Sequence, residues 1–373
     1  MKQVRHVLGI SGGKDSAALA IYIKDNYPEI HEKIEYYTSD TGRELDETYK
    51  LIDNLENYLG KKILRLTGVI NEDMGLTPFD FFLKSYGGYL PSTNARWCTK
   101  KLKLDPFEKF VGSDPVISYV GIRGDEDREG YISKKNTIQS IFPFRRNIWS
   151  EDVINKVLNN NNIDFLITNF ETIDTKIDAV RFIEILRTPI SNAYTQTTKL
   201  KALLEIGTKE FNRLVFSYMK ITEYPLSLEE QFSLIDNDEV IVLDDVFSIL
   251  KNSNVGVPAY YNKVEFEVNG KKGSYSRSRS GCFFCFYQQK IEWVWLYEQH
   301  NELFVKAMEY EKEGYTWMQD EPLSEICKPE RMNKIKEDFI KKTENRKVIL
   351  PGGKFIDNPV FDDEQEGCAS CFV

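Results

Sequence analysis

The sequence predicts an α/β fold with a doubly wound, mostly parallel sheet. Near the start of the chain, the apolar run 7–10 is followed by a Ser/Gly turn at 11–16 and by a helical pattern from residue 17. The same order of strand, turn and helix returns at 34–59. The run 116–122 is a further buried strand that ends in a charged loop. Strands that alternate with helices favour a parallel sheet with helices on both faces.

Length and composition are those of a globular protein with a large core. The chain has 373 residues, of which 41% are hydrophobic and 13% aromatic, enough for one large or two ordinary domains. It contains neither a run near the ~18 apolar residues of a membrane helix nor a signal-peptide pattern, so we expect a cytoplasmic protein without a membrane partner. The net charge is −9, and a polyanion would therefore need a local basic patch.

The turn Ser11-Gly12-Gly13-Lys14-Asp15-Ser16 has the chemistry of a phosphate-binding loop. A strand, a glycine turn and a helix start direct several backbone N–H groups and the positive end of the helix dipole at one point. The glycines let the backbone approach an anion, Lys14 adds a cation, and Ser11 and Ser16 offer hydroxyls. The spacing differs from the Walker pattern. The structural alternative is a turn that binds no ligand.

These six residues match the PP-loop signature Ser-Gly-Gly-x-Asp-Ser, so the chain resembles the adenine-nucleotide α-hydrolase-like superfamily. The stretch from Arg96 to Phe107 is similar to the Cys-Thr-x-x-Leu-Lys segment of PAPS-reductase-like enzymes, including ATP pyrophosphatases of DNA phosphorothioation systems. The resemblance implies binding of ATP and Mg²⁺, release of pyrophosphate and activation of a substrate as its adenylate. Relatives in the PAPS reductase family bind a sulfonucleotide with the same fold.

Charged residues follow two of the other predicted strands. Asp40 and Gly42 come after the second strand, and Arg123 to Glu126 come after the strand at 116–122. Because the carboxyl ends of parallel strands meet at one edge of a sheet, both loops should face the PP-loop. In PP-loop proteins resembling this one, the end of the second strand contacts adenosine. The structural alternative for Asp40 is a helix N-cap.

The loop after the strand at 116–122 resembles the family pattern Gly-Ile-Arg-x-Asp-Glu followed by Arg. Arg123 and Arg128 could clamp phosphate oxygens, and Asp125 or Glu126 could hold Mg²⁺. The structural alternative is ion pairing on the surface. The predicted catalytic residues are Lys14, Asp15 and Asp125, and the predicted ATP site comprises Ser11, Gly12, Gly13, Lys14, Asp15, Ser16, Asp40, Gly42, Gly121, Arg123 and Arg128.

Four of the six cysteines form two C-x-x-C pairs, Cys282 with Cys285 and Cys368 with Cys371. Four thiolates suit tetrahedral Zn²⁺ or a [4Fe–4S] cluster, and spacing alone does not separate the two. The family resemblance favours the cluster and also allows Cys98 as a ligand in place of the C-terminal pair. The alternative for that pair is a mobile, unligated chain end, and Cys327 is expected to be a small buried hydrophobe.

The resemblance divides the chain into three parts. Residues 1–148 are predicted to form the PP-loop nucleotide-binding domain, and 243–373 a Cys-rich C-terminal region with the metal site. Between them, 149–242 carries amphipathic helical patterns without identifiable chemistry, which predicts a helical insertion. Oligomeric state stays open.

Three functions compete. The first is an ATP pyrophosphatase that adenylates a substrate, expected to be a nucleic acid, for sulfur transfer from a donor such as a cysteine desulfurase. The second is a sulfonucleotide (PAPS or APS) reductase, whose Glu-Cys-Gly-Leu-His tail is replaced here by Cys368-Ala369-Ser370-Cys371. The third is a non-catalytic nucleotide sensor.

The nucleic-acid expectation depends on two basic segments inside the motifs, since phosphate contacts need concentrated cations. The structural alternative is that these cations hold only the phosphates of the nucleotide. The residues are Arg96, Lys100, Lys101, Lys103, Arg277 and Arg279.

Overall fold

The computed structural model describes residues 4–68, 75–126 and 135–346, and their centre is a five-stranded sheet in the order β3-β2-β1-β4-β5. Every neighbouring pair is parallel, which confirms the predicted fold class. The chain builds outward from β1 to β3 and then crosses to the other side of β1 for β4. The strands are β1 (Arg5–Gly9), β2 (Ile34–Ser39), β3 (Ile63–Leu66), β4 (Val116–Tyr119) and β5 (Ile138–Ile141).

Helices cover both faces of this sheet, as alternating side chains on β1 show. Leu8 packs into a core with apolar residues of α1, α3 and α12. Val7, its neighbour, points the other way and packs with Phe107 and Val111 of α6. The helices of this part are α1 (Lys14–Asn26), α2 (Pro28–Lys33), α3 (Asp46–Leu59), α4 (Pro78–Ser85), α5 (Trp97–Thr99), the π-helix η2 (Lys100–Leu104) and α6 (Asp105–Val111).

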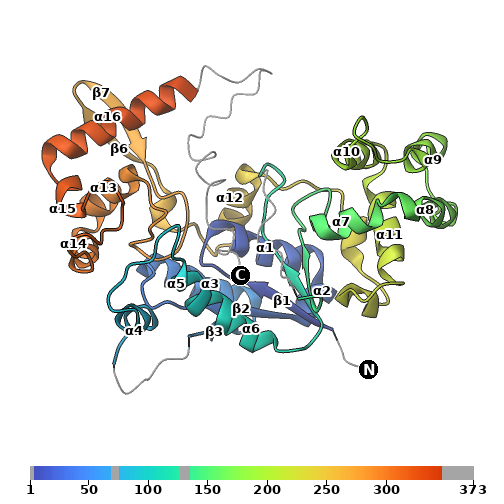
Figure 1. Ribbon diagram of the computed structural model, residues 1–373, viewed down its shortest axis with the longest axis horizontal. Helices are drawn as coiled ribbons and strands as arrows, with labels where there is room; N and C mark the ends of the chain where they lie inside the picture. The colour runs from blue at the N-terminus through green and yellow to red at the C-terminus, as the bar shows by residue number, and fades with distance from the viewer. Residues whose placement is uncertain (1–3, 69–74, 127–134, 347–373) are drawn as a thin grey trace.

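The segment between β5 and β6 is helical, and most of it extends to one side of the sheet (Figure 1). Its apolar residues join the core beneath α1, so it is not a separate hydrophobic unit. The elements are α7 (Glu151–Val157), η3 (Asn160–Asn162), α8 (Ile163–Phe170), α9 (Ala179–Arg187), α10 (Gln196–Ile206), α11 (Thr208–Met219), η4 (Pro225–Leu228), η5 (Ser233–Asp236), α12 (Leu243–Asn252) and η6 (Ala259–Tyr261).

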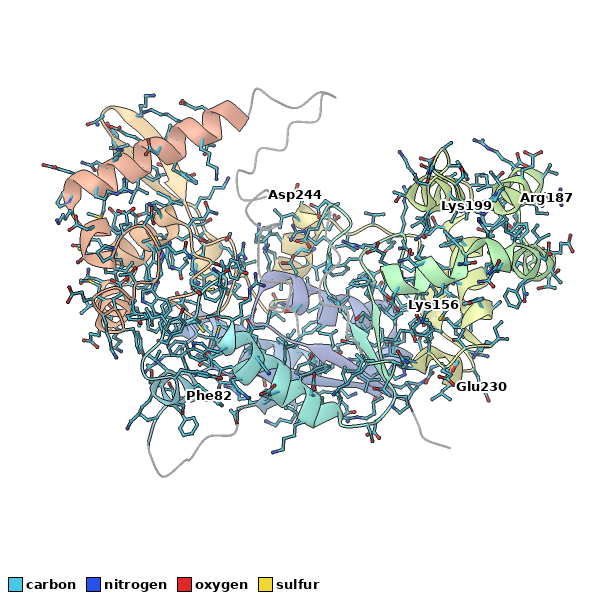
Figure 2. The ribbon with its side chains drawn as sticks, viewed as in Figure 1. Phe82, Lys156, Arg187, Lys199, Glu230 and Asp244 are labelled. Carbon is cyan, nitrogen blue, oxygen red and sulfur yellow. The ribbon has the colours of Figure 1, made fainter. Side chains whose placement is uncertain are left out.

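Lys199 holds this helical segment together from inside (Figure 2). Its fully buried ammonium donates to the carbonyls of Leu186 and Thr188, 2.8 and 2.7 Å away, where α9 ends. Burial lowers the pKa of Lys199 to about 8. The lysine thus satisfies carbonyls that the end of a helix leaves unpaired.

The C-terminal part forms a second core at the opposite end of the molecule (Figure 1). Phe284 stacks on Trp317 and contacts Phe79 of α4, so this core also includes the N-terminal half. None of the helices that the structure describes is long and apolar enough to cross a membrane. The elements are the antiparallel pair β6 (Val264–Val268) and β7 (Lys271–Tyr275), with α13 (Lys290–Gln299), α14 (Asn301–Glu309), α15 (Leu323–Ile326) and α16 (Pro329–Arg346).

Candidate nucleotide site and the adjacent cysteine pair

The PP-loop connects β1 to α1 in a tight turn that requires its glycines. Gly12 has a φ of +72°, and a Cβ there would lie 2.2 Å from Cγ2 of Thr48. Gly13 is the N-cap of α1, and a Cβ there would lie 2.7 Å from Oγ of Ser280. The loop is therefore packed closely against α3 on one side and against the C-terminal part on the other.

Side-chain hydroxyls accept hydrogen bonds from three N–H groups of the loop. The N–H of Ser11 donates to Ser16 Oγ at 3.1 Å, and the N–H of Gly13 donates to Ser11 Oγ at 3.3 Å. The N–H of Lys14, at the start of α1, donates to the hydroxyl of Tyr261 at 3.3 Å. The two bonds at 3.3 Å are long for an N–H donor to oxygen, and each of the three holds a donor that could otherwise bind a phosphate oxygen.

Arg123 connects the PP-loop to the loop after β4. It is fully buried and lies 2.7 Å from a carboxylate oxygen of Asp15, 2.9 Å from Asp125 and 3.0 Å from Glu126. Burial alone would raise the pKa of Asp15, but the charges of Lys14 and Arg123 outweigh it and hold that pKa below its usual value. Arg123 does form the ion pairs with its loop neighbours that were considered from sequence, but these pairs are buried and not on the surface.

The same two loops approach each other through their backbones. Gly121 follows β4, and a Cβ there would lie 2.9 Å from the carbonyl oxygen of Asp15. The ammonium of Lys14 lies 3.3 Å from Asp15 and donates to the carbonyl of Ser278 at 3.4 Å. β1 and β4 are the strands between which the chain reverses its direction of winding, so these residues lie where α/β sheets bind ligands.

Asp40 and Gly42 form a turn at the end of β2. Asp40 accepts a hydrogen bond from the N–H of Gly42 at 2.8 Å and from the hydroxyl of Tyr49 at 3.0 Å. The N-cap of α3 is Leu45, so the alternative that Asp40 caps this helix is wrong. Tyr49 also donates to Glu44, whose pKa is raised by burial and by the charge of Asp40.

The pair Cys282 and Cys285 lies in a turn attached to this β2 loop. The N–H of Cys285 donates to the carbonyl of Cys282 at 3.2 Å, and Cys282 forms a backbone bridge with Glu44. Sγ of Cys282 lies 3.2 Å from the hydroxyl of Thr41. Burial raises the pKa of both thiols, and the charge of Glu44 raises that of Cys282 further.

Of the four cysteines predicted to bind the metal, the structure describes two, Cys282 and Cys285. Within residues 4–68, 75–126 and 135–346, no three His, Cys, Asp or Glu side chains are placed to hold a metal ion. Cys368 and Cys371 lie outside the described residues, as does Arg128 of the predicted nucleotide site. Cys98 and Cys327 are half-buried and pack against the same aromatic core as Cys282.

Buried polar atoms without partners lie close to this cysteine turn. Arg277 is 1% exposed and donates to the carbonyl of Cys282 at 3.1 Å, but its Nε and Nη1 have no hydrogen-bond partner among the described residues. The buried side-chain amide of Gln288 also has none. Unmet donors of this kind are costly, and they fit a site whose thiolates carry negative charge when loaded with metal.

The two basic segments meet at the same turn. Lys103, Arg277 and Arg279 all lower the pKa of Cys285 through their charge, although burial outweighs them. The guanidinium of Arg96 lies 5.3 Å from the ring centre of Tyr287. Arg277 is buried, and Lys101 is paired with Asp105 at 2.7 Å.

Four residues of the site were not predicted from the sequence. Tyr260 donates to the carbonyl of Gly12 at 3.0 Å, and Ser280 donates to that of Ser11 at 3.2 Å. Tyr261 and Ser278 contact Lys14, as described above. The serines lie beside the Cys282 motif, which gave a usable signal, whereas no local pattern distinguishes the tyrosines.

We predict that Arg123→Met lowers the free energy of unfolding by about 3–5 kcal/mol, because it leaves buried carboxylates without their cation. The matched control is Arg213→Met, which breaks an exposed pair with Asp236 of the same length, 2.7 Å, and should cost at most about 1 kcal/mol. Urea unfolding of both variants measures the difference. Equal losses would show that the Arg123 network does not stabilise the fold.

Comparison with known proteins covers the first part of the chain. Residues 5–165 match the family model described as the phosphoadenosine phosphosulfate reductase domain. An uncharacterized protein of Methanocaldococcus jannaschii is 33% identical over 149 residues, which are 36% of this chain and 28% of that protein. The chain thus spans less than a third of this relative. No solved structure matches the chain. The comparison thus shows similarity to this domain for residues 5–165.

Proposed function

We propose that the protein is a PP-loop ATP pyrophosphatase that adenylates a substrate in preparation for sulfur transfer. The observation that carries this proposal is the junction of the PP-loop with the loop after β4, held by Asp15 and Arg123 at 2.7 Å. It gathers backbone donors, a lysine and carboxylates at the carboxyl ends of neighbouring strands. A donor such as a cysteine desulfurase would supply the sulfur.

Catalysis at such a site is electrostatic. The N–H groups of the loop and the N-terminus of α1 would hold the phosphates, and Lys14 would neutralise charge that develops as the α–β bond breaks. Asp125 and Glu126 are the candidate Mg²⁺ ligands, and Mg²⁺ would share their carboxylates with Arg123 and, for Asp125, with the N–H of Leu243. Mg²⁺ would supply charge neutralisation on the phosphate oxygens.

With α-labelled ATP, Mg²⁺ and an acceptor, we expect AMP and pyrophosphate as products. Lys14→Met should lower turnover by about 10²–10³-fold, because it removes a cation aimed at the developing charge. The control is Lys24→Met at the other end of α1, where the ammonium bonds to the carbonyl of Tyr58. Production of ADP and phosphate, or equal turnover by both variants, would contradict the proposal.

The family match favours a second candidate, a sulfonucleotide reductase. This reaction needs a thiol nucleophile and an external dithiol. The two enzymes differ in products, because the reductase releases sulfite from PAPS or APS without consuming ATP. Sulfite release in the presence of reduced thioredoxin would favour the reductase.

We also propose that Cys282 and Cys285 hold a metal centre, a [4Fe–4S] cluster or alternatively Zn²⁺. Its remaining ligands would be Cys368 and Cys371 or, in their place, Cys98. The buried guanidinium of Arg277 supports this proposal, because it donates to the carbonyl of Cys282 and keeps two unmet nitrogens whose positive charge an anionic thiolate centre nearby would balance. The centre would fix the cysteine turn in place and, as a cluster, could transfer single electrons.

Protein purified without oxygen should be brown, with broad visible absorption and bound iron. Cys282→Ser and Cys285→Ser should each lower the metal content markedly, since each removes a thiolate ligand. Cys327→Ser is the matched control, because that half-buried thiol donates to the carbonyl of Ser324 instead. Metal content that is the same in all three variants would rule out this site, and zinc alone would rule out the cluster.

We propose a nucleic acid as the acceptor, contacted by the basic segments around the cysteine turn. Support comes from Lys103 and Arg279, whose charges both act on Cys285. Ser278 and Ser280, which flank Arg279, contact Lys14 and Ser11 of the PP-loop. The burial of Arg277 makes it a structural cation and not a surface phosphate contact. In the segment 96–104, Arg96 and Lys100 are exposed, and Lys101 and Lys103 are half-buried.

Gel shifts with duplex DNA and tRNA should show binding that weakens by roughly 0.9 log units per log unit of salt for each phosphate neutralised on DNA. Lys100→Glu together with Arg279→Glu should weaken binding, because each change replaces a cation of one of the two basic segments with an anion. Lys201→Glu, on the exposed face of α10, is the control. If the double variant and the control bind alike, a small-molecule acceptor is the better conclusion.

A further inference from the structure

The contact between Tyr261 and the PP-loop joins two residues that lie 247 positions apart. The Tyr261 hydroxyl accepts a hydrogen bond from the N–H of Lys14 at 3.3 Å. The ammonium of the same lysine lies 5.0 Å from the centre of the Tyr261 ring. Tyr261 thus contacts the backbone N–H of Lys14 and lies near its ammonium, which also pairs with Asp15 and donates to the carbonyl of Ser278.

This N–H is the donor that a phosphate would use. Gly13, the N-cap of α1, has no side chain that could accept a hydrogen bond, so the first turn of the helix depends on an outside acceptor. An anion is the favoured acceptor, because the helix dipole adds positive potential there. A neutral hydroxyl at 3.3 Å is a weak substitute.

The neighbours of Tyr261 hold it over the loop. Tyr260 donates to the carbonyl of Gly12, and the centre of the Tyr261 ring lies 4.6 Å from that of Tyr260 and 6.2 Å from that of Phe247. Lys14 is only 3% exposed in this arrangement. The N–H of Lys14 is therefore buried and occupied by the Tyr261 hydroxyl.

We propose that Tyr261 is a competitor for the phosphate position, and that its hydroxyl must leave the N–H of Lys14 before pyrophosphate or a nucleotide phosphate can bind. The inference rests on the proposed function, since it assumes that the PP-loop binds phosphate. Tyr261 then lowers the affinity of the loop for phosphate by the free energy of the hydrogen bond that is broken. It is a residue that sets affinity and takes no part in the bond-breaking step.

Titration calorimetry with inorganic pyrophosphate and Mg²⁺ tests this proposal on the full chain. Tyr261→Phe should bind pyrophosphate about two- to fivefold more tightly than the original protein, the effect of losing one weak neutral hydrogen bond in the free state. The ring remains, so its packing against Tyr260 and Phe247 is kept, and thermal melting confirms the fold. Tyr58→Phe is the matched control, because its hydroxyl bonds only to Asp25 on the surface.

The outcomes separate the two proposals. Tighter binding by Tyr261→Phe than by the original protein and Tyr58→Phe supports the competitor role. Equal or weaker binding by Tyr261→Phe overturns it and leaves the PP-loop function intact; weaker binding would indicate that the hydroxyl contacts phosphate itself. If none of the three proteins binds pyrophosphate, both the competitor role and the proposed function fall.

Discussion

The ion pair between Asp15 and Arg123 is the interaction on which the site depends. It joins α1, which follows β1, to the loop that follows β4, across the point where the winding of the sheet reverses. Arg123 is fully buried, and its charge is costly there unless neighbouring carboxylates compensate it. Asp125 and Glu126 supply the other two carboxylates. The single charge of Arg123 therefore holds the PP-loop and the loop after β4 in their relative orientation.

The second half of the chain completes the candidate site. Tyr260, Tyr261 and Ser280 contact the PP-loop, and Cys282 bridges to Glu44 after β2. Because Ser280 and Cys282 are two residues apart, the loop contact and the cysteine turn share one short piece of backbone. A shift of the cysteine turn would therefore also move Ser280 relative to the PP-loop.

Local sequence patterns were enough to predict the fold class and the site residues of the N-terminal part. Apolar runs marked β1, β2 and β4, and Gly12 was identified as a loop residue, in agreement with its positive φ. Contacts between distant residues left no such pattern. The hydroxyl of Tyr261 reaches Lys14, and the carboxylate of Asp15 reaches Arg123, only in the folded chain, and the π-helix at Lys100–Leu104 has no simple sequence signature.

The distance along the chain between Lys14 and Tyr261 also matters during synthesis. Ribosomes add about 5–20 residues per second, so the PP-loop leaves the ribosome roughly 12–50 s before the tyrosine that covers it. The sheet of β1 to β5 can assemble in that interval, since all five strands precede residue 142. If the PP-loop binds nucleotide as proposed, a nascent chain would meet it before Tyr261 occupies the N–H of Lys14, and the binding would stabilise the folded sheet before the C-terminal part arrives.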